Sequence, residues 1–203
     1  MKEGQEFKAE VIQGLNEVPY GAWRDGLFSC CKHGVGHVHL WLGFCFPWCM
    51  LGQIATRVGL FSSLARDTFG MSTFRMFFVA TVVFCTADIL SSCIQNAYAD
   101  DGDDAASNNA IPTFPLVILS ICQLVQCVLG IAGCVATIHT RQHVRDVYNI
   151  PATLPAEDVL CACCCSSCTI CQMARHTTDY YKEDAEMCTE TGLGADTMTT
   201  VIV

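Results

Sequence analysis

Residues 114–138 read FPLVILSICQLVQCVLGIAGCVATI and contain no Asp, Glu, Lys or Arg. A helix needs about 20 apolar residues to cross the hydrocarbon core of a bilayer, so this stretch is long enough and leaves room for tilt. A second stretch, residues 76–99, reads MFFVATVVFCTADILSSCIQNAYA and carries one charge, Asp88. The two stretches predict two transmembrane helices. Two buried helices of a soluble protein are the alternative, but a chain of 203 residues seldom buries two such helices on every side.

The segment that joins these stretches is acidic. Residues 100–110 contain no Lys or Arg, and their acids are Asp100, Asp101, Asp103 and Asp104. Basic residues flank the pair on its other side, at Arg57, Arg66, Arg75, Arg141 and Arg145. Because basic residues favour the cytosolic side, we expect a helical hairpin with both termini in the cytosol and the acidic loop outside. The loop either concentrates cations at an entrance or is a solvated turn.

A third apolar stretch precedes the hairpin. Residues 39–56 read HLWLGFCFPWCMLGQIAT and carry no Asp, Glu, Lys or Arg, but Pro47 and its flanking Gly43 and Gly52 break a helix. At this length and with these residues, a re-entrant or interfacial segment is favoured over a full span. A true span would place the N-terminus on the opposite side of the membrane.

The composition excludes several classes of protein. Apolar residues make up 52% of the chain and charged residues 15%, against about 25% charged in a soluble domain, which argues against a soluble enzyme. A net charge of −9 disfavours nucleic-acid binding. We find no phosphate-binding glycine loop, HExxH motif or nucleophile elbow, so we expect no enzyme, with a thiol redox enzyme as a distant alternative. Residues 1–18 lack the apolar run of a signal peptide, which disfavours a secreted disulfide scaffold, so the cysteines that flank the predicted spans are expected to stay reduced in the cytosol.

Two cysteine clusters flank the hairpin, CCKHGVGHVH from residue 30 and CACCCSSCTIC from residue 161. Thiolates and imidazoles favour zinc or another soft divalent metal. The candidate metal ligands are Cys30, Cys31, His33, His37, Cys45, Cys49, Cys161, Cys163, Cys164, Cys165, Cys168 and Cys171. Palmitoylation is the alternative, because juxtamembrane cysteines are its usual acceptors, and a small apolar interfacial patch is a third reading. For the histidines, the alternative is that they bind no metal and only lie at the membrane interface.

Asp88 lies inside a predicted span. A carboxylate there costs roughly 2.5 to 3.5 kcal/mol on insertion scales, so its side chain must face protein, water or a partner. In an oligomer, several copies would line an ion path and attract cations. The structural alternative is a hydrogen bond across the hairpin to Ser91, Ser92 or Gln123.

Three motifs together carry a family resemblance. They are CFPWCMLGQIA from residue 45, YNIP from residue 148 and CSSCTICQMAR from residue 165. The chain resembles the placenta-specific-eight family of Cys-rich membrane proteins, which includes cornifelin and the plant cadmium-resistance and cell-number-regulator proteins. The matching stretches are about 23–57 and 141–175. Two features depart from the family pattern, because Trp48 separates Pro47 from Cys49 and the segment between the motifs is long.

The resemblance implies an integral membrane protein, often of the plasma membrane, that self-associates and is linked to divalent metal efflux, calcium influx or growth control. It implies no catalysis. Our first hypothesis is a cation- or metal-handling oligomer, acting by efflux or as a channel. The alternative is a non-transporting scaffold or accessory subunit of a larger complex, in which palmitoylation of the cysteines would help to anchor the chain.

The expected fold class is an all-α membrane protein, a transmembrane helical hairpin with flanking Cys-rich cytosolic or re-entrant segments. The expected partners are membrane lipid and further copies of the chain or a larger membrane complex. The division is an N-terminal tail (1–22), a first Cys-rich motif (23–58), the hairpin (59–140), a second Cys-rich motif (141–178) and an acidic C-terminal tail (179–203). The tail is expected to be disordered because it is rich in acids.

Overall fold

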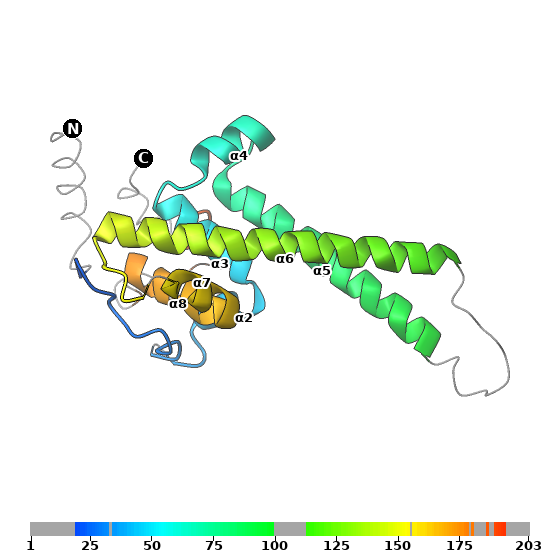
Figure 1. Ribbon diagram of the computed structural model, residues 1–203, viewed down its shortest axis with the longest axis horizontal. Coiled ribbons are helices and arrows are strands. Elements are labelled where there is room, and N and C mark those ends of the chain that lie inside the picture. Colours follow the sequence, from blue (N-terminus) through cyan, green and yellow to red (C-terminus); the bar gives the residue numbers. More distant parts are fainter. Residues whose placement is uncertain are drawn as a thin grey trace. The chain divides into compact units, whose positions relative to one another are not determined.

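The computed structural model describes residues 19–32, 34–99, 113–154, 156–178, 180, 186 and 189–193. These residues contain helices and no strand, so the all-α prediction is confirmed. In chain order the helices are α2 (Val38–Cys45), α3 (Pro47–Arg57), α4 (Ser62–Phe69), α5 (Thr73–Ala99), α6 (Thr113–Tyr148), α7 (Glu157–Cys164) and α8 (Ser166–Thr177) (Figure 1).

Helices α5 and α6 correspond to the two predicted spans, and both are long and apolar enough to cross a membrane. Pro115 lies in the first turn of α6, where its missing N–H costs no helical hydrogen bond. With 36 residues, α6 is about 54 Å long, whereas the hydrocarbon core is about 30 Å thick. The helix therefore continues well beyond residue 138, where the apolar stretch ends.

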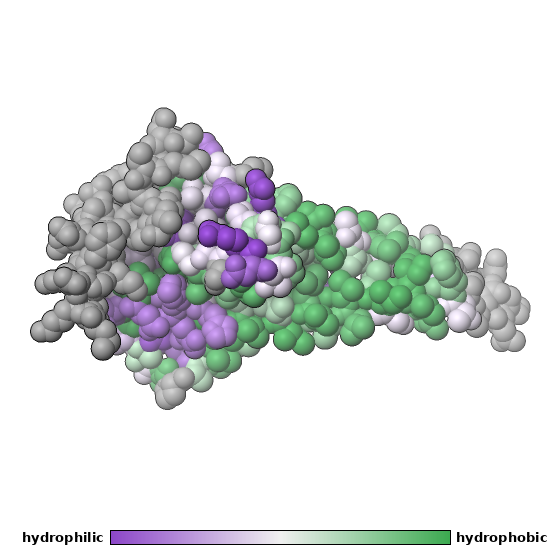
Figure 2. Space-filling view, turned by 90° about the horizontal axis from the view of Figure 1, so that it is seen from above, coloured by the Kyte–Doolittle hydropathy of each residue, from purple (hydrophilic) through white to green (hydrophobic). Residues whose placement is uncertain are grey.

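The chain divides into two compact units, and the second, Val79–Gly133, consists of the central parts of the two long helices. Its large apolar side chains point outward, as lipid-facing side chains do, and Figure 2 shows hydrophobic residues covering this surface. They include Val79, Val82, Val83, Ile89 and Leu90 on α5, and Leu116, Val117, Ile121, Leu124, Val128 and Ile131 on α6. The unit has the surface of a membrane-spanning hairpin.

The third apolar stretch forms two helices and not one. Helices α2 and α3 meet at an angle of 113°, which is the geometry of a broken span or a re-entrant loop. Pro47 occupies the first turn of α3, so the chain bends where the sequence predicts a break. This bend agrees with the favoured re-entrant or interfacial reading and excludes a single straight span.

The first unit comprises the described residues of Met1–Phe78 and Cys134–Val203, and its core lies between α3 and α8. Its fully buried side chains include Leu51 and Ile54 on α3 and Ile170 and Met173 on α8. Helix α6 joins this core through Val144. The two Cys-rich motifs, which are far apart in the sequence, thus form one hydrophobic core.

The YNIP motif stops α6. Asn149 adopts the left-handed conformation with φ of 54°, and the N–H of Ile150 donates to the carbonyl oxygen of Arg145 at 2.9 Å. This pair is the 6→1 bond of a Schellman motif, and Pro151 then prevents the helix from continuing. The motif therefore sets the point at which the chain turns back toward α7.

The acidic tail is not wholly solvated, which corrects the expectation of disorder for its described residues. The Gln53 side chain donates to the carbonyl oxygens of Glu186 and Thr189, at 3.2 and 3.1 Å. The Arg57 guanidinium donates to the carbonyl oxygen of Thr191. Because Thr191 and Leu193 are buried, part of the tail packs on α3 as a structural element.

Candidate functional site

A network of buried charges joins α6 to α7 and α8. The Arg141 side chain is 2% exposed and donates to three acceptors. Its Nε lies 3.0 Å from Asp158 Oδ1, its Nη2 lies 3.0 Å from Glu157 Oε1, and its Nη1 lies 2.7 Å from Gln172 Oε1. The planar guanidinium suits this arrangement because its donors diverge in fixed directions.

Asp158 holds a second arginine as well. Its Oδ2 accepts from Arg145 Nη1 at 2.7 Å, while Arg145 Nε donates to the carbonyl oxygen of Ile150 at 3.2 Å. The guanidinium carbon of Arg141 also lies 4.5 Å from the centroid of the Trp23 ring, which is a cation–π contact. The network therefore fixes the first turn of α7 against α6 and brings in the N-terminal segment.

The N-terminal segment is tied to α8 by three further contacts. The Gln172 amide donates to the carbonyl oxygen of Asp25 at 2.9 Å, and Arg175 Nη2 donates to that of Gly26 at 3.3 Å. Arg175 Nε lies 3.5 Å from Asp25 Oδ2. Gln172 and Arg175, which belong to the CxxCQxxR motif, thus have a structural role, since they fasten residues 23–26 to the core.

Sequence reasoning missed this network. From the sequence, Arg141 and Arg145 are only charges that set topology, yet in the structure both are buried and paired with carboxylates. The sequence does contain an indication of these ion pairs. Arg141 and Arg145 are four residues apart, so they lie on one helix face, and the consecutive acids Glu157 and Asp158 come later in the same chain segment.

The ionised form of Glu157 is stabilised by its neighbours. Hydrogen bonds from Thr153, followed by the charge of Arg141, lower the pKa of Glu157 to about 2, against a weaker opposing effect of burial. A carboxyl with a lowered pKa stabilises the fold above its unfolded-state pKa of about 4.5, and this contribution is lost as the pH falls toward 2. We expect the wild type to be more stable than Glu157→Gln at pH 6. The difference in melting temperature should shrink between pH 4.5 and pH 2, and a difference that is constant with pH would contradict this account.

A second cluster contains thiols from both Cys-rich motifs. Cys30 from the first motif lies close enough to Cys168 and Cys171 on α8 to affect the pKa of both, and its thiol donates to the carbonyl oxygen of Leu27 at 3.6 Å. Burial raises the pKa of Cys168 to about 11 and that of Cys171 to about 12. The thiols of Cys168 and Cys171 are therefore protonated at neutral pH.

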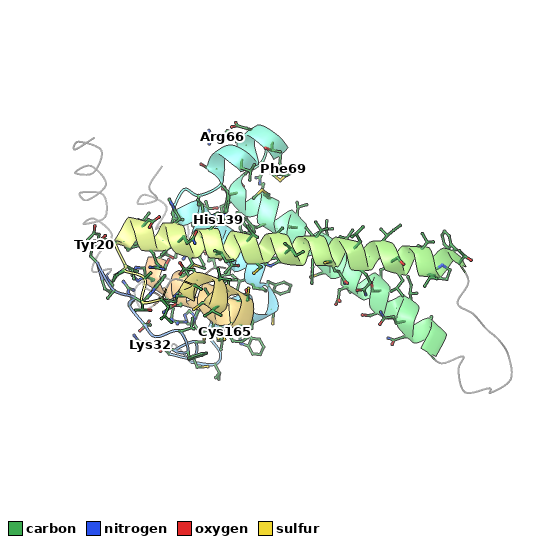
Figure 3. The ribbon with its side chains drawn as sticks, viewed as in Figure 1. Tyr20, Lys32, Arg66, Phe69, His139 and Cys165 are labelled. Carbon is green, nitrogen blue, oxygen red and sulfur yellow. The ribbon has the colours of Figure 1, made fainter. Side chains whose placement is uncertain are left out.

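The remaining candidate ligands are distributed over the first unit. Cys49 is buried in α3, Cys161 and Cys165 are half-buried, and Cys31, Cys45, Cys163 and Cys164 are exposed. Cys165 lies between α7 and α8 (Figure 3). His33 and the loop residues Asp100, Asp101, Asp103 and Asp104 lie outside the described residues. Among the residues that are described, no three or more His, Cys, Asp or Glu side chains are arranged to hold a metal ion.

Three of the described histidines, His37, His39 and His176, pack with aromatic rings. His37 caps α2, and its Nδ1 lies 2.7 Å from Nδ1 of His39, whose ring stacks on Tyr180 at 5.0 Å. At the end of α8, burial and the charge of Arg24 lower the pKa of His176 to about 4, so this ring is neutral at physiological pH. Its edge contacts Tyr148 at a centroid distance of 4.5 Å. This aromatic packing was not predicted from the sequence.

Asp88 is placed in the second unit, on the surface of α5. Its Oδ1 accepts one hydrogen bond, at 3.2 Å, from the amide of Gln126 on α6. The cross-hairpin hydrogen bond that the sequence suggested therefore exists, with Gln126 as the donor in place of Ser91, Ser92 or Gln123. The carboxylate remains exposed on the helix pair.

The comparisons with known proteins agree with these motifs. Neither the curated proteins nor the solved structures gave a match to the chain. The family model described as PLAC8 matches residues 23–176, which include both Cys-rich motifs, the hairpin and the buried charge network. The predicted resemblance is confirmed, and this all-α chain with two candidate membrane spans belongs to the PLAC8 family.

Proposed function

We propose that this chain is a subunit of a homo-oligomeric membrane protein that carries divalent metal or other cations across the bilayer. The observation that supports this most directly is Asp88. It is the one acidic or basic residue of the predicted spans 76–99 and 114–138, and its carboxylate is exposed with a single hydrogen bond from Gln126.

An exposed carboxylate at membrane depth needs compensation that lipid cannot supply. This compensation comes from a second copy of the chain, from a water-filled path or from a cation. In a ring of several copies, the Asp88 carboxylates would face one another across a water-filled path that admits cations. The proposed topology places both termini in the cytosol and the acidic loop outside, with the plasma membrane as the favoured location.

Cys30, Cys168 and Cys171 are the proposed soft ligands on the cytosolic side. The described side chains are not arranged to hold an ion, so these three thiols would have to move together around it. Because burial raises the pKa of Cys168 and Cys171, these two thiols hold their protons at neutral pH, and a soft divalent ion must displace the protons to bind. Capture of zinc or cadmium is therefore expected to strengthen as the pH rises. Elemental analysis of the detergent-purified protein at two pH values measures this.

The transport proposal is tested in cells that lack their own metal exporter. Cells that express the wild type should accumulate less zinc or cadmium than cells with an empty vector. Asp88→Asn keeps the size and the acceptor oxygen that Gln126 contacts but removes the charge, so it should raise accumulation to the empty-vector level.

Asp67→Asn is the matched control, because Asp67 is an exposed acid of α4 and lies outside both spans. It should behave like the wild type at equal membrane expression. Wild-type transport by Asp88→Asn would overturn the role of this carboxylate, and transport lost equally in both variants would point to a general defect.

A specific observation favours a second candidate, a non-transporting scaffold that is acylated. Cys45 ends α2 beside the exposed Phe44 and Phe46, and Cys164 ends α7 near the exposed Leu160. Exposed thiols beside apolar side chains suit S-acylation at a membrane surface. Hydroxylamine-sensitive palmitate at Cys45 and Cys164, with no metal in the purified protein, would favour this function.

A further inference from the structure

Two cysteines from different helices are in contact at one edge of the first unit. Cys134 Sγ on α6 lies 3.4 Å from Cys163 Sγ on α7. A disulfide has an S–S distance of about 2.05 Å, so the two sulfurs need to approach by about 1.4 Å. Cys163 is exposed and Cys134 is half-buried, which leaves the pair open to a small reagent.

The contact between Cys134 and Cys163 is a second attachment of α7 to α6, in addition to the ion pairs of α7. The first turn of α7 is held to α6 by the ion pairs of Glu157 and Asp158 with Arg141. On α6, residues 134 and 141 are seven apart, which places them on one face two turns away from each other. The thiol contact therefore joins the last turn of α7 to α6, whereas the ion pairs join the first turn of α7 to α6.

We propose that Cys134 and Cys163 form a reversible disulfide latch that fastens the last turn of α7 to α6 when a hydroperoxide is present. The Cys163 thiolate attacks one oxygen of hydrogen peroxide, which breaks the O–O bond, gives a sulfenic acid and releases one water once protonated. The Cys134 thiol then attacks the sulfenic sulfur, loses its proton and displaces a second water. Two thiols and one peroxide thus yield one disulfide and two waters, and a dithiol such as dithiothreitol reverses the step.

The closed latch joins residues 134 and 163 into one covalent loop. A closed loop restricts the unfolded chain, so the oxidised protein should melt at a higher temperature than the reduced protein. With α7 fastened at both ends, its exposed face, which carries Leu160 and Cys164, becomes a fixed surface.

The experiment uses the full chain in detergent, treated with hydrogen peroxide, blocked with N-ethylmaleimide and digested with trypsin without reduction. No Lys or Arg lies between Arg75 and Arg141 or between Arg145 and Arg175, so Cys134 and Cys163 leave in the separate peptides 76–141 and 146–175. We expect one linked species, lighter by two hydrogens than the sum of the two peptides, which disappears on reduction.

Four variants locate the bond. Cys134→Ser and Cys163→Ser should abolish the linked species and the rise in melting temperature, while Cys164→Ser and Cys127→Ser should retain both. Cys164 is the exposed neighbour of Cys163, and Cys127 is an exposed cysteine of α6, so each is a matched control. Absence of the linked species in the wild type, or its loss in Cys164→Ser with retention in Cys163→Ser, would overturn the proposal. Absence of the linked species from the wild-type digest overturns the proposal even where a variant fails to fold.

Discussion

Arg141→Ala is expected to unfold the first unit at a temperature lower by on the order of 10 °C. The substitution removes the donors to Asp158, Glu157 and Gln172 together with the cation–π contact to Trp23. Removing one partner of a buried ion pair costs about 3–5 kcal/mol, because the opposite charge stays buried. In a chain of this size each kcal/mol lowers the melting temperature by about 2–4 °C. Thermal unfolding in detergent, followed by tryptophan fluorescence, measures the shift.

Arg66→Ala provides the comparison, because Arg66 is an exposed arginine of α4 (Figure 3). A surface substitution of this kind changes stability by no more than about 0.5 kcal/mol. Arg141→Lys should lie between the two, since an ammonium keeps the charge but not the divergent donors. Equal melting temperatures for Arg141→Ala and Arg66→Ala would mean that the network does not stabilise the unit.

Gly52→Ala is expected to have the next largest effect, because the backbone of α3 lies against α5 at this residue. A Cβ at residue 52 would lie 2.8 Å from Phe77 Cβ and 3.4 Å from Phe74 Cα. Neither atom can move away without moving the backbone of α5, so the two helices must separate. Overpacking of this kind costs about 1–3 kcal/mol. The measurement is the melting temperature together with the yield of monodisperse protein.

Gly130→Ala separates this close approach from a general effect of adding a methyl group to a helix. No atom lies within 4 Å of a Cβ built at residue 130, and alanine favours a helix more than glycine does. Gly130→Ala should therefore melt at or above the wild-type temperature. The packing argument fails if Gly52→Ala is as stable as Gly130→Ala.

The sequence predicts those parts of the fold that depend on one local property, such as apolar length, a proline or the spacing of a motif. A long apolar stretch with at most one charge identifies each span, and Pro47 marks the bend between α2 and α3. Motif spacing identifies the family, since CxxCQxxR and YxIP occur together with CFPxC. These signals are local in the sequence, so they need no knowledge of how distant segments pack.

The contacts between distant segments could not be predicted in the same way. Arg141 reads as a charge beside a membrane until the fold brings Asp158, Gln172 and Trp23 around it. The acidic tail reads as disordered because composition does not show that Gln53 and Arg57 bind its carbonyl oxygens. Asp88 was recognised by its cost in lipid, but its donor, Gln126, depends on the register of two helices.

The core of the first unit is assembled from residues on both sides of the hairpin, and this has a consequence for synthesis in the cell. Helix α3 emerges from the ribosome long before α8, and the segment Val79–Gly133 lies between them in the chain. Until α8 is made, the apolar side chains of Leu51 and Ile54 have no partner helix on that side. During synthesis the apolar side chains of α3 are therefore exposed to chaperones or to lipid. The core forms only after both spans and α8 have been translated.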